Sequence, residues 1–346
     1  MKKILNVGIA GYGTVGKIRH RFIDEHPRMK VWAVCDQSFS DPSRKLKAVR
    51  CFTNYQALLK EPLDVLFVCL PNYLAGDVTI AGLEKGLHVF CEKPPGKDVA
   101  DIERVIACEK KHLRQKLMYG FNHRYHDSVR EAQRIIRSGK LGKILNIRGV
   151  YGKSKIIRFD SDWRTKRALA GGGVFLDQGI HMVDLMRLFA GEFTRIHSFV
   201  SNNFWHHDVE DNVFALMQTK DGVVAQLHSS ATQWRHSFNL VLNLTKGSII
   251  LSGILSSTKS YGAETITIVY ARDKDAGDPY EEMFRYNEDN SWRDEVFDFA
   301  RAIGDNKKIK HGSSKEALAT MKMVYRIYFA DPQWRKKFNI PDPDRA

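Results

Sequence analysis

The first 121 residues alternate between two hydrophobic patterns, and this alternation constrains the fold more than any other feature of the chain. Continuous apolar runs of strand length occur at 4–10, 31–35, 65–70, 89–91 and 117–121. Amphipathic stretches with helical spacing lie between them, for example at 15–26, 74–85 and 98–111. Uninterrupted apolar strands are typical of a parallel sheet that is buried on both faces by crossover helices. The pattern therefore predicts an α/β domain with a doubly wound parallel sheet.

After residue 122 the pattern changes. Helices are expected at 128–138 and 178–189, with a strand at 144–151 between them. Strand-like stretches then follow in series at 196–201, 213–219, 223–230, 238–244, 248–251 and 265–270. Two helices, at 292–303 and 314–330, follow these strands. Grouped strands with helices at the ends predict an α+β domain whose open sheet is a largely antiparallel meander. We therefore divide the chain into domains at 1–121 and 122–346.

A glycine-rich motif directly follows the first predicted strand and opens the first predicted helix. It consists of Gly11, Tyr12, Gly13, Thr14, Val15 and Gly16. In a G-x-G-x-x-G turn of this kind, the first glycine allows the tight turn and the second lets the backbone approach a pyrophosphate. The third lets the helix pack close to the sheet, and the helix N-terminus supplies amide donors to the phosphates. The first domain is therefore predicted to bind a dinucleotide.

Asp36 follows the second predicted strand, 36 − 16 = 20 residues beyond the last glycine of the motif. A carboxylate at this position can accept hydrogen bonds from the hydroxyls of an adenosine ribose and would repel a 2′-phosphate. The position favours NAD as the cofactor. The cations Arg44, Lys45 and Lys47 lie close enough in sequence that NADP is not excluded.

Two later strand ends are also expected to border the cofactor, because ligands of open α/β sheets bind at the carboxyl ends of the strands. The residues concerned are Leu70, Pro71 and Asn72, which close the run at 65–70, and Glu92 and Lys93 after the run at 89–91. Two prolines follow Lys93, and they would hold this lysine rigidly and partly desolvated. A lysine in that setting can hydrogen-bond to a substrate hydroxyl or exchange a proton with it.

The segment GGGVFLDQGIHMVD at 171–184 is the most unusual in the chain. If it is helical from Asp177, then Asp177, His181 and Asp184 fall at i, i+4 and i+7 on one face. Carboxylates flanking an imidazole suit a general base. The same face could also bind a metal or form a buried structural pair. Because no fourth ligand is suggested, we predict no metal site.

Just before this segment, residues 151–167 carry six lysines and arginines but only two aspartates. The arginines, Arg164 among them, could clamp a phosphate or carboxylate over the site, and a solvated basic loop is the alternative. The cluster at 205–208, Trp-His-His-Asp, is interpreted as a loop surface, since adjacent residues of an extended strand point in opposite directions.

Composition narrows the remaining classes of protein. The chain has 346 residues, of which 43% are hydrophobic, and no apolar run is long enough to cross a bilayer. Five cysteines without a C-x-x-C pair indicate neither a disulfide framework nor a metal site. The net charge of +14 would attract nucleic acid or an anionic small molecule, but no nucleic-acid-binding motif accompanies it. These features favour a cytoplasmic protein that contacts neither membrane nor nucleic acid.

Taken together, the motifs resemble the Gfo/Idh/MocA family of sugar-type dehydrogenases over nearly the whole chain. The resemblance rests on GYGTVG at 11–16, the segment 53–59, LPN at 70–72, EKPP at 92–95, GFNHR at 120–124 and the segment at 171–184. It implies that Lys93, Asp177 and His181 touch the reacting sugar hydroxyl. Within GFNHR we predict that Asn122 contacts the cofactor and Arg124 the substrate. The family's second domain often forms an oligomer interface, so a homodimer or homotetramer is expected.

The working hypothesis is an NAD(P)-dependent dehydrogenase that acts on a ring hydroxyl of a sugar derivative. We expect an anionic substrate such as a nucleotide sugar, amino sugar or sugar phosphate. Lys93, Arg124, Arg164, Asp177 and His181 would contact it. One alternative is a regulatory protein that binds NAD without catalysis, and another is a nucleic-acid-associated protein.

Overall fold

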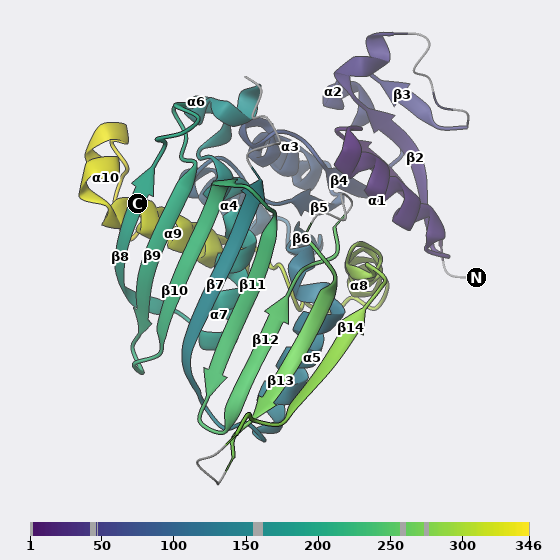
Figure 1. Cartoon of the computed structure of the whole chain (residues 1–346). Coiled ribbons are helices and arrows are strands. Elements are labelled where there is room, and N and C mark those ends of the chain that lie inside the picture. The colour runs from purple at the N-terminus through teal and green to yellow at the C-terminus, as the bar shows by residue number, and fades with distance from the viewer. Residues whose placement is uncertain are drawn as a thin grey trace. The chain divides into compact units, whose positions relative to one another are not determined.

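The computed structural model describes residues 3–41, 46, 48–154, 162–256, 261–272 and 277–345 (Figure 1). The contacts between residues divide the chain into two compact units. The first unit comprises Met1–Asn122 and Trp292–Ala319, and the second comprises His123–Ser291 and Thr320–Ala346. The two units are described separately below.

The first unit is built on a six-stranded parallel sheet with strand order β3-β2-β1-β4-β5-β6, which confirms the predicted doubly wound class. The strands are β1 (Leu5–Ala10), β2 (Met29–Cys35), β3 (Arg50–Phe52), β4 (Val65–Val68), β5 (His88–Glu92) and β6 (Leu117–Gly120). The helices between them are α1 (Thr14–Glu25), α2 (Tyr55–Leu58), α3 (Asn72–Glu84) and α4 (Val99–Glu109). The short strand β3 was not predicted.

Both faces of this sheet are covered, as the continuous apolar strands require. Phe67 of β4 and Phe90 of β5 stack at 4.8 Å and meet Phe299 of α8 (Ser291–Gly304) edge-on. Side chains of the opposite face, Leu66 and Val89, lie against α3. Thus α8, which the division at residue 121 assigns to the second domain, packs on the sheet of the first unit.

A buried ion cluster joins three segments of the first unit. The fully buried Arg19 of α1 lies 2.6 Å from a carboxylate oxygen of Glu92 at the end of β5, and 2.6 Å from one of Glu295 in α8. Its guanidinium carbon also lies 4.4 Å from the ring centroids of Phe90 and Trp292. The cation therefore has two charge partners and two aromatic rings around it.

The second unit contains an eight-stranded sheet with order β14-β13-β12-β11-β7-β10-β9-β8. Its strands are β7 (Ile144–Ser154), β8 (Phe193–Ser201), β9 (Asn212–Thr219), β10 (Val224–Gln233), β11 (Ser237–Leu244), β12 (Gly247–Ser252), β13 (Glu264–Tyr270) and β14 (Glu281–Tyr286). The sheet is largely antiparallel, but a simple meander is wrong at one point. Strand β7 lies between β10 and β11 and runs parallel to β10. The exposed edge strand β14 was not predicted.

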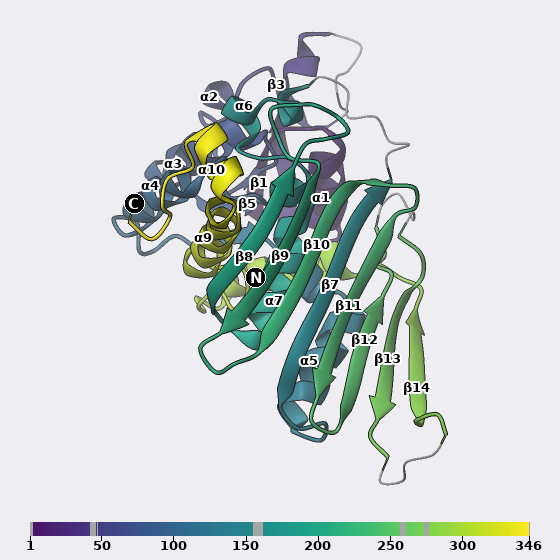
Figure 2. The ribbon, with the colours of Figure 1, turned by 60° about the vertical axis from the view of Figure 1, so that its left-hand side comes forward.

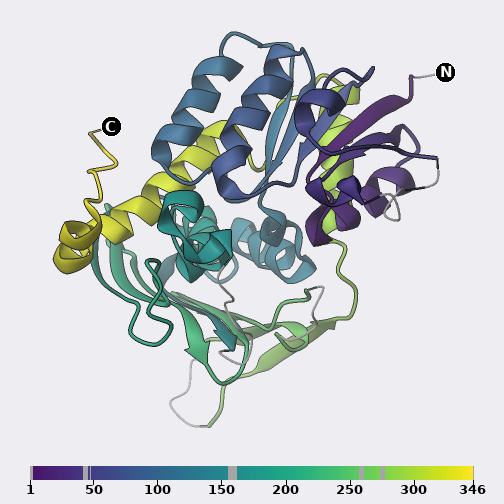
Figure 3. The ribbon, with the colours of Figure 1, turned by 90° about the horizontal axis from the view of Figure 1, so that it is seen from above.

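Helices α5 (Asp127–Ser138) and α7 (Ile180–Ala190) lie on one face of this sheet (Figure 3). The alternation along β11 explains this arrangement, because every second side chain of that strand is buried. The other face of the sheet stands open in Figure 2. In the part of the chain that the structure describes, no helix is long and apolar enough to cross a bilayer.

The ion cluster yields the first prediction. Replacing Arg19 by Met leaves the buried carboxylates of Glu92 and Glu295 without this counter-charge, and should cost about 3–5 kcal/mol of unfolding free energy. Urea denaturation measures the loss. The matched control is Arg21→Gln on the same helix, because Arg21 is 73% exposed and its pair with Glu25 should contribute no more than about 0.5 kcal/mol. Equal losses in the two variants would contradict the assignment.

Candidate active site

The glycine-rich turn joins β1 to α1 and requires glycine at two positions. Gly11 has a φ of +91°, and a Cβ added there would lie 2.2 Å from the carbonyl oxygen of Cys69. A Cβ on Gly16 would lie 2.1 Å from the carbonyl oxygen of Gly11. These contacts are the tight turn and the close helix–strand approach predicted for the first and third glycines.

Gly13 differs, because a Cβ added there would meet no described atom within 4 Å. It is the N-cap of α1, and among the described residues no side chain caps that helix end. Open space in front of uncapped amide donors suits an anionic group. The residues therefore fit a dinucleotide, whose pyrophosphate the backbone of Gly13, Thr14 and Val15 would hold.

Asp36 lies at the carboxyl end of β2, beside this turn. Its carboxylate accepts hydrogen bonds from the backbone amides of Tyr12 and Ser38, each at 2.9 Å. Although burial raises the pKa of Asp36, the hydrogen bonds from Ser38 and Tyr12 outweigh this and lower it below its usual value. The ionised carboxylate is thus oriented where the ribose hydroxyls are predicted to bind.

The remaining predicted cofactor residues follow three adjacent parallel strands. Leu70 and Pro71 follow β4, and the buried Asn72 begins α3. Glu92 ends β5 and is paired with Arg19, and the partly buried Lys93 follows it with a cis peptide bond to Pro94. The buried Asn122 follows β6. Because these strands are parallel neighbours, their carboxyl ends lie along the same edge of the sheet as the glycine turn.

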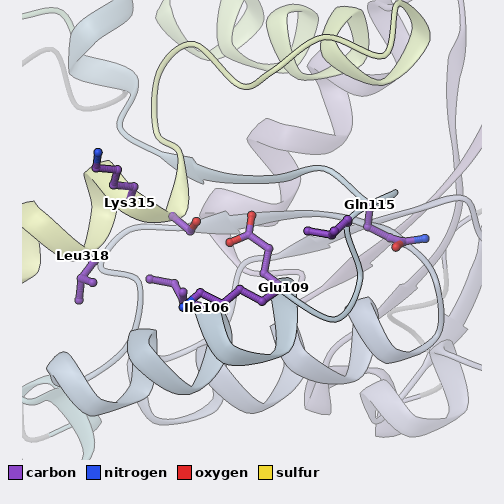
Figure 4. A pocket seen from close by; sticks show the side chains of 8 residues that line it. Ile106, Glu109, Gln115, Lys315 and Leu318 are labelled. Carbon is purple, nitrogen blue, oxygen red and sulfur yellow. The ribbon is translucent and has the colours of Figure 1, made fainter.

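A cavity of about 430 Å³ in the first unit lies at the opposite ends of the strands from the glycine turn (Figure 4). Ile106 and Glu109 of α4, Gln115 just before β6, and Lys315 and Leu318 of α9 (Ser314–Ala330) are among the residues that line it. Strand β6 begins here, so the cavity is at the amino ends of the strands. It contains none of the predicted site residues.

In the second unit, Asp177 does not begin a regular α-helix as predicted. Phe175–Gly179 forms a π-helical turn, which runs directly into α7. The wider turn changes the angle between Asp177 and His181 from that of an i, i+4 pair in an α-helix. Asp177 is partly exposed, whereas His181 is buried.

Asp184 and Arg124 form a buried ion pair instead of flanking the site. Two of the guanidinium nitrogens of Arg124, Nε and Nη2, lie 2.6 and 2.7 Å from the carboxylate oxygens of Asp184. The hydroxyl of Thr320 donates to the same carboxylate at 3.0 Å. This buried ion pair holds the guanidinium of Arg124 within its own unit, and the substrate contact of Arg124 stays a prediction.

Glu210 supports the segment that carries Asp177, and sequence reasoning missed it. Its buried carboxylate accepts hydrogen bonds from the amide of Gly173 at 2.7 Å, the amide of Phe175 at 3.0 Å and the hydroxyl of Tyr328 at 2.7 Å. Burial raises the pKa of this carboxyl group. Glu210 lies in the loop before β9, so only the tertiary fold brings it to the glycine run.

The basic stretch is only partly described, since Lys155 and Arg158 fall within residues 155–161, outside the described residues. Arg164 is exposed, pairs with Asp162 at 3.2 Å and lies over the ring of Trp163. Asp208 of the Trp-His-His-Asp cluster accepts a hydrogen bond from the backbone amide of Arg167. Across the described ranges, no group of three or more His, Cys, Asp or Glu side chains could hold a metal ion.

The described fold and the glycine turn define a class, namely a protein with a dinucleotide-binding domain. The family model described as "Oxidoreductase family, NAD-binding Rossmann fold" matches residues 5–121. The model described as "GFO/IDH/MocA C-terminal domain" matches residues 129–250. The chain therefore belongs to the Gfo/Idh/MocA family, and its first unit binds NAD.

Curated relatives share about a quarter of the sequence. Levoglucosan dehydrogenase of Pseudarthrobacter phenanthrenivorans is 25% identical over 292 residues, covering 72% of this chain and 73% of that protein. D-xylose 1-dehydrogenase (NADP(+)) 2 of Haloferax volcanii is 26% identical over 328 residues, covering 92% and 95%. The solved structure of levoglucosan dehydrogenase with NADH and levoglucosan has a TM-score of 0.83 at 20% identity, covering 96% and 98%. This structural likeness confirms the fold.

The contrast between the glycines gives the second prediction. Gly13→Leu should weaken NADH binding at least about tenfold, because its side chain fills the space that the pyrophosphate needs. It should change the melting temperature little, since a Cβ at this position meets no described atom within 4 Å and φ is −74°.

The matched variant is Gly11→Ala, which forces a Cβ against the Cys69 carbonyl and should lower the melting temperature clearly. Calorimetric NADH titration and thermal unfolding measure the two effects. If Gly13→Leu bound NADH as the wild type does, the pyrophosphate would lie elsewhere.

Proposed function

We propose that the protein is a dehydrogenase that moves a hydride between the nicotinamide of NAD and a ring hydroxyl or ketone of a sugar derivative. The observation that carries the proposal is the glycine turn of the first unit, with its open uncapped helix end and its oriented Asp36. Lys93, at the carboxyl ends of the same strands, supplies an ammonium group. His181, which follows the π-helical turn in sequence, supplies an imidazole, and alcohol oxidation needs both groups. Relatives named as dehydrogenases of levoglucosan, D-xylose and myo-inositol support the substrate class.

In this proposal the bound nicotinamide supplies the hydride acceptor during oxidation. His181 takes the proton of the sugar hydroxyl as the C–H bond yields its hydride. Lys93 donates a hydrogen bond to the same oxygen and offsets its developing charge, and Asp177 orients the hydroxyl. In the reductive direction His181 returns the proton to the carbonyl oxygen.

The finer choice of substrate stays a proposal. The net charge of +14 and the exposed Arg164 favour an anionic sugar, whereas several relatives are named for neutral sugars. Another relative is named for 2,7-anhydro-N-acetylneuraminate, which carries a carboxylate. Turnover of neutral sugars, sugar phosphates and nucleotide sugars, each assayed with NAD and NADP, decides between these classes. A non-catalytic NAD-binding protein would turn over none of them.

The third prediction tests the reacting groups. His181→Ala and Lys93→Ala should each lower kcat by about 10²-fold or more, because each removes a group that acts on the proton or charge of the hydroxyl. NADH affinity should survive in His181→Ala. The matched controls, His206→Ala and Lys110→Ala, alter exposed residues and should retain activity. Full turnover in both site variants would refute the assignment.

We also propose that two copies of the chain associate through the open face of the second unit's sheet. Phe199 of β8 is 78% exposed and pairs with the exposed Phe214 of β9, which in turn stacks on His228 of β10. Leu216, also exposed, follows on the same face of β9. Neighbouring exposed apolar side chains of this kind are typical of a surface that is buried in an assembly.

The fourth prediction follows from this surface. Phe199→Asp should shift the sedimentation coefficient of the full chain from that of an oligomer to a smaller species, because it places a charge in the apolar contact. Leu113→Asp is the matched control, since Leu113 is 82% exposed but lies in the first unit. A wild-type protein that sediments as a monomer would overturn the proposal, and so would an unchanged Phe199→Asp variant.

A further inference from the structure

We propose that His123 is a positioning residue for His181. Its neutral ring, stacked on that of His181, holds the orientation of the base and stabilises the protonated form of that base. The inference rests on the proposed function, in which His181 accepts the hydroxyl proton. It concerns a residue that plays no part in the roles assigned above.

The two imidazoles form a close parallel stack inside the second unit. Their ring centroids are 3.7 Å apart, and the angle between the ring planes is 11°. Both side chains are buried. His123 comes from the short helix η3 (Asn122–Tyr125), whereas His181 lies in the first turn of α7. Two imidazolium cations this close in a buried position would repel each other strongly, so at most one of the two rings is positively charged.

In this proposal His181 carries the positive charge and His123 stays neutral. The Nε2 atom of His123 lies 3.0 Å from the hydroxyl oxygen of Tyr151. Burial, and then the nearby Tyr261 and Asp177, raise the pKa of Tyr151 well above its usual value, so this hydroxyl keeps its proton. We assign the Tyr151 hydroxyl as the donor to Nε2, and in this arrangement His123 is the neutral tautomer with its proton on Nδ1.

The surroundings fix the ring of His123 in place. Tyr151 and Phe238 contact it at centroid distances of 5.6 and 6.1 Å, and His126 meets it edge-on at 5.4 Å. Among the described residues, the titratable and charged groups near the pair include Asp177 before α7, Tyr151 on β7, Tyr261 with His236, the buried His126–Glu264 pair, and the Arg124–Asp184 pair.

The Arg124–Asp184 ion pair also fixes how the two rings are placed relative to each other. Arg124 is the residue after His123, and Asp184 lies three residues after His181, so their bidentate ion pair joins η3 to α7 beside the two rings. A neutral aromatic ring against a desolvated cation stabilises the charged form. In this proposal the stack favours the protonated form of His181.

The test compares His123→Ala with His123→Phe in the full chain. His123→Ala should lower the proton affinity of His181 about tenfold and lower kcat by about the same factor. The KM for the sugar and the NADH affinity should change little. Histidine NMR titration gives the proton affinity directly, with the His181 signal assigned by its loss in His181→Asn. The acidic limb of the kcat/KM profile should move to lower pH in step with it.

His123→Phe keeps a neutral ring against His181 and should restore most of the lost proton affinity and kcat. Melting temperatures and NADH binding show whether the variants fold. The inference is overturned if His123→Ala leaves the titration of His181 unchanged, or if His123→Phe is as impaired as His123→Ala. If instead His181→Ala keeps full turnover, the proposed function fails, and the NMR titration still reports on the stack.

Discussion

The buried guanidinium of Arg19 is the interaction on which the first unit depends, because it draws together helices and a strand that are far apart in the chain. A cation in an apolar interior is costly unless it is paired, and here two carboxylates and two aromatic rings surround it. One carboxylate, Glu92, ends the strand that leads into Lys93. The other, Glu295, belongs to a helix that follows the whole second sheet. The ion cluster thus links the covering of the parallel sheet to the position of a proposed catalytic lysine.

Local pattern was enough to predict most of the first unit. The continuous apolar runs led to five of its six strands, and the glycine turn with Asp36 was recognised from spacing alone. The apolar runs and the glycine turn can both be recognised from residues that are close together in the sequence. Strand β3 was missed because its three residues, one exposed and two partly buried, carry no hydrophobic pattern. The place of α8 was missed because its partners, Phe67 and Phe90, lie more than 200 residues earlier, and periodicity shows that a helix has an apolar face without showing what that face meets.

In the second unit seven of the eight described strands were found, but their order and the edge strand β14 were not. Strand β7 has the same apolar alternation whether it pairs at an edge or in the centre, so sequence alone gave no reason to insert it between β10 and β11. The π-helical turn was missed for a similar reason. It is stabilised by Glu210, which comes from a distant part of the chain and accepts hydrogen bonds from the amides of Gly173 and Phe175.

Asp177 and Asp184 show why residue type and spacing do not settle a catalytic role. Both are acidic, both flank His181, and an ideal helix would present them on one face. The structure separates them, because Asp184 meets a buried arginine and a threonine hydroxyl, whereas the wider turn leaves Asp177 partly exposed. A carboxylate that is already neutralised by a buried guanidinium has little capacity to orient a substrate. What distinguishes the two residues is therefore the partner that the tertiary fold supplies, and the same holds for His123, whose stacking on His181 has no counterpart in the spacing of the two histidines along the chain.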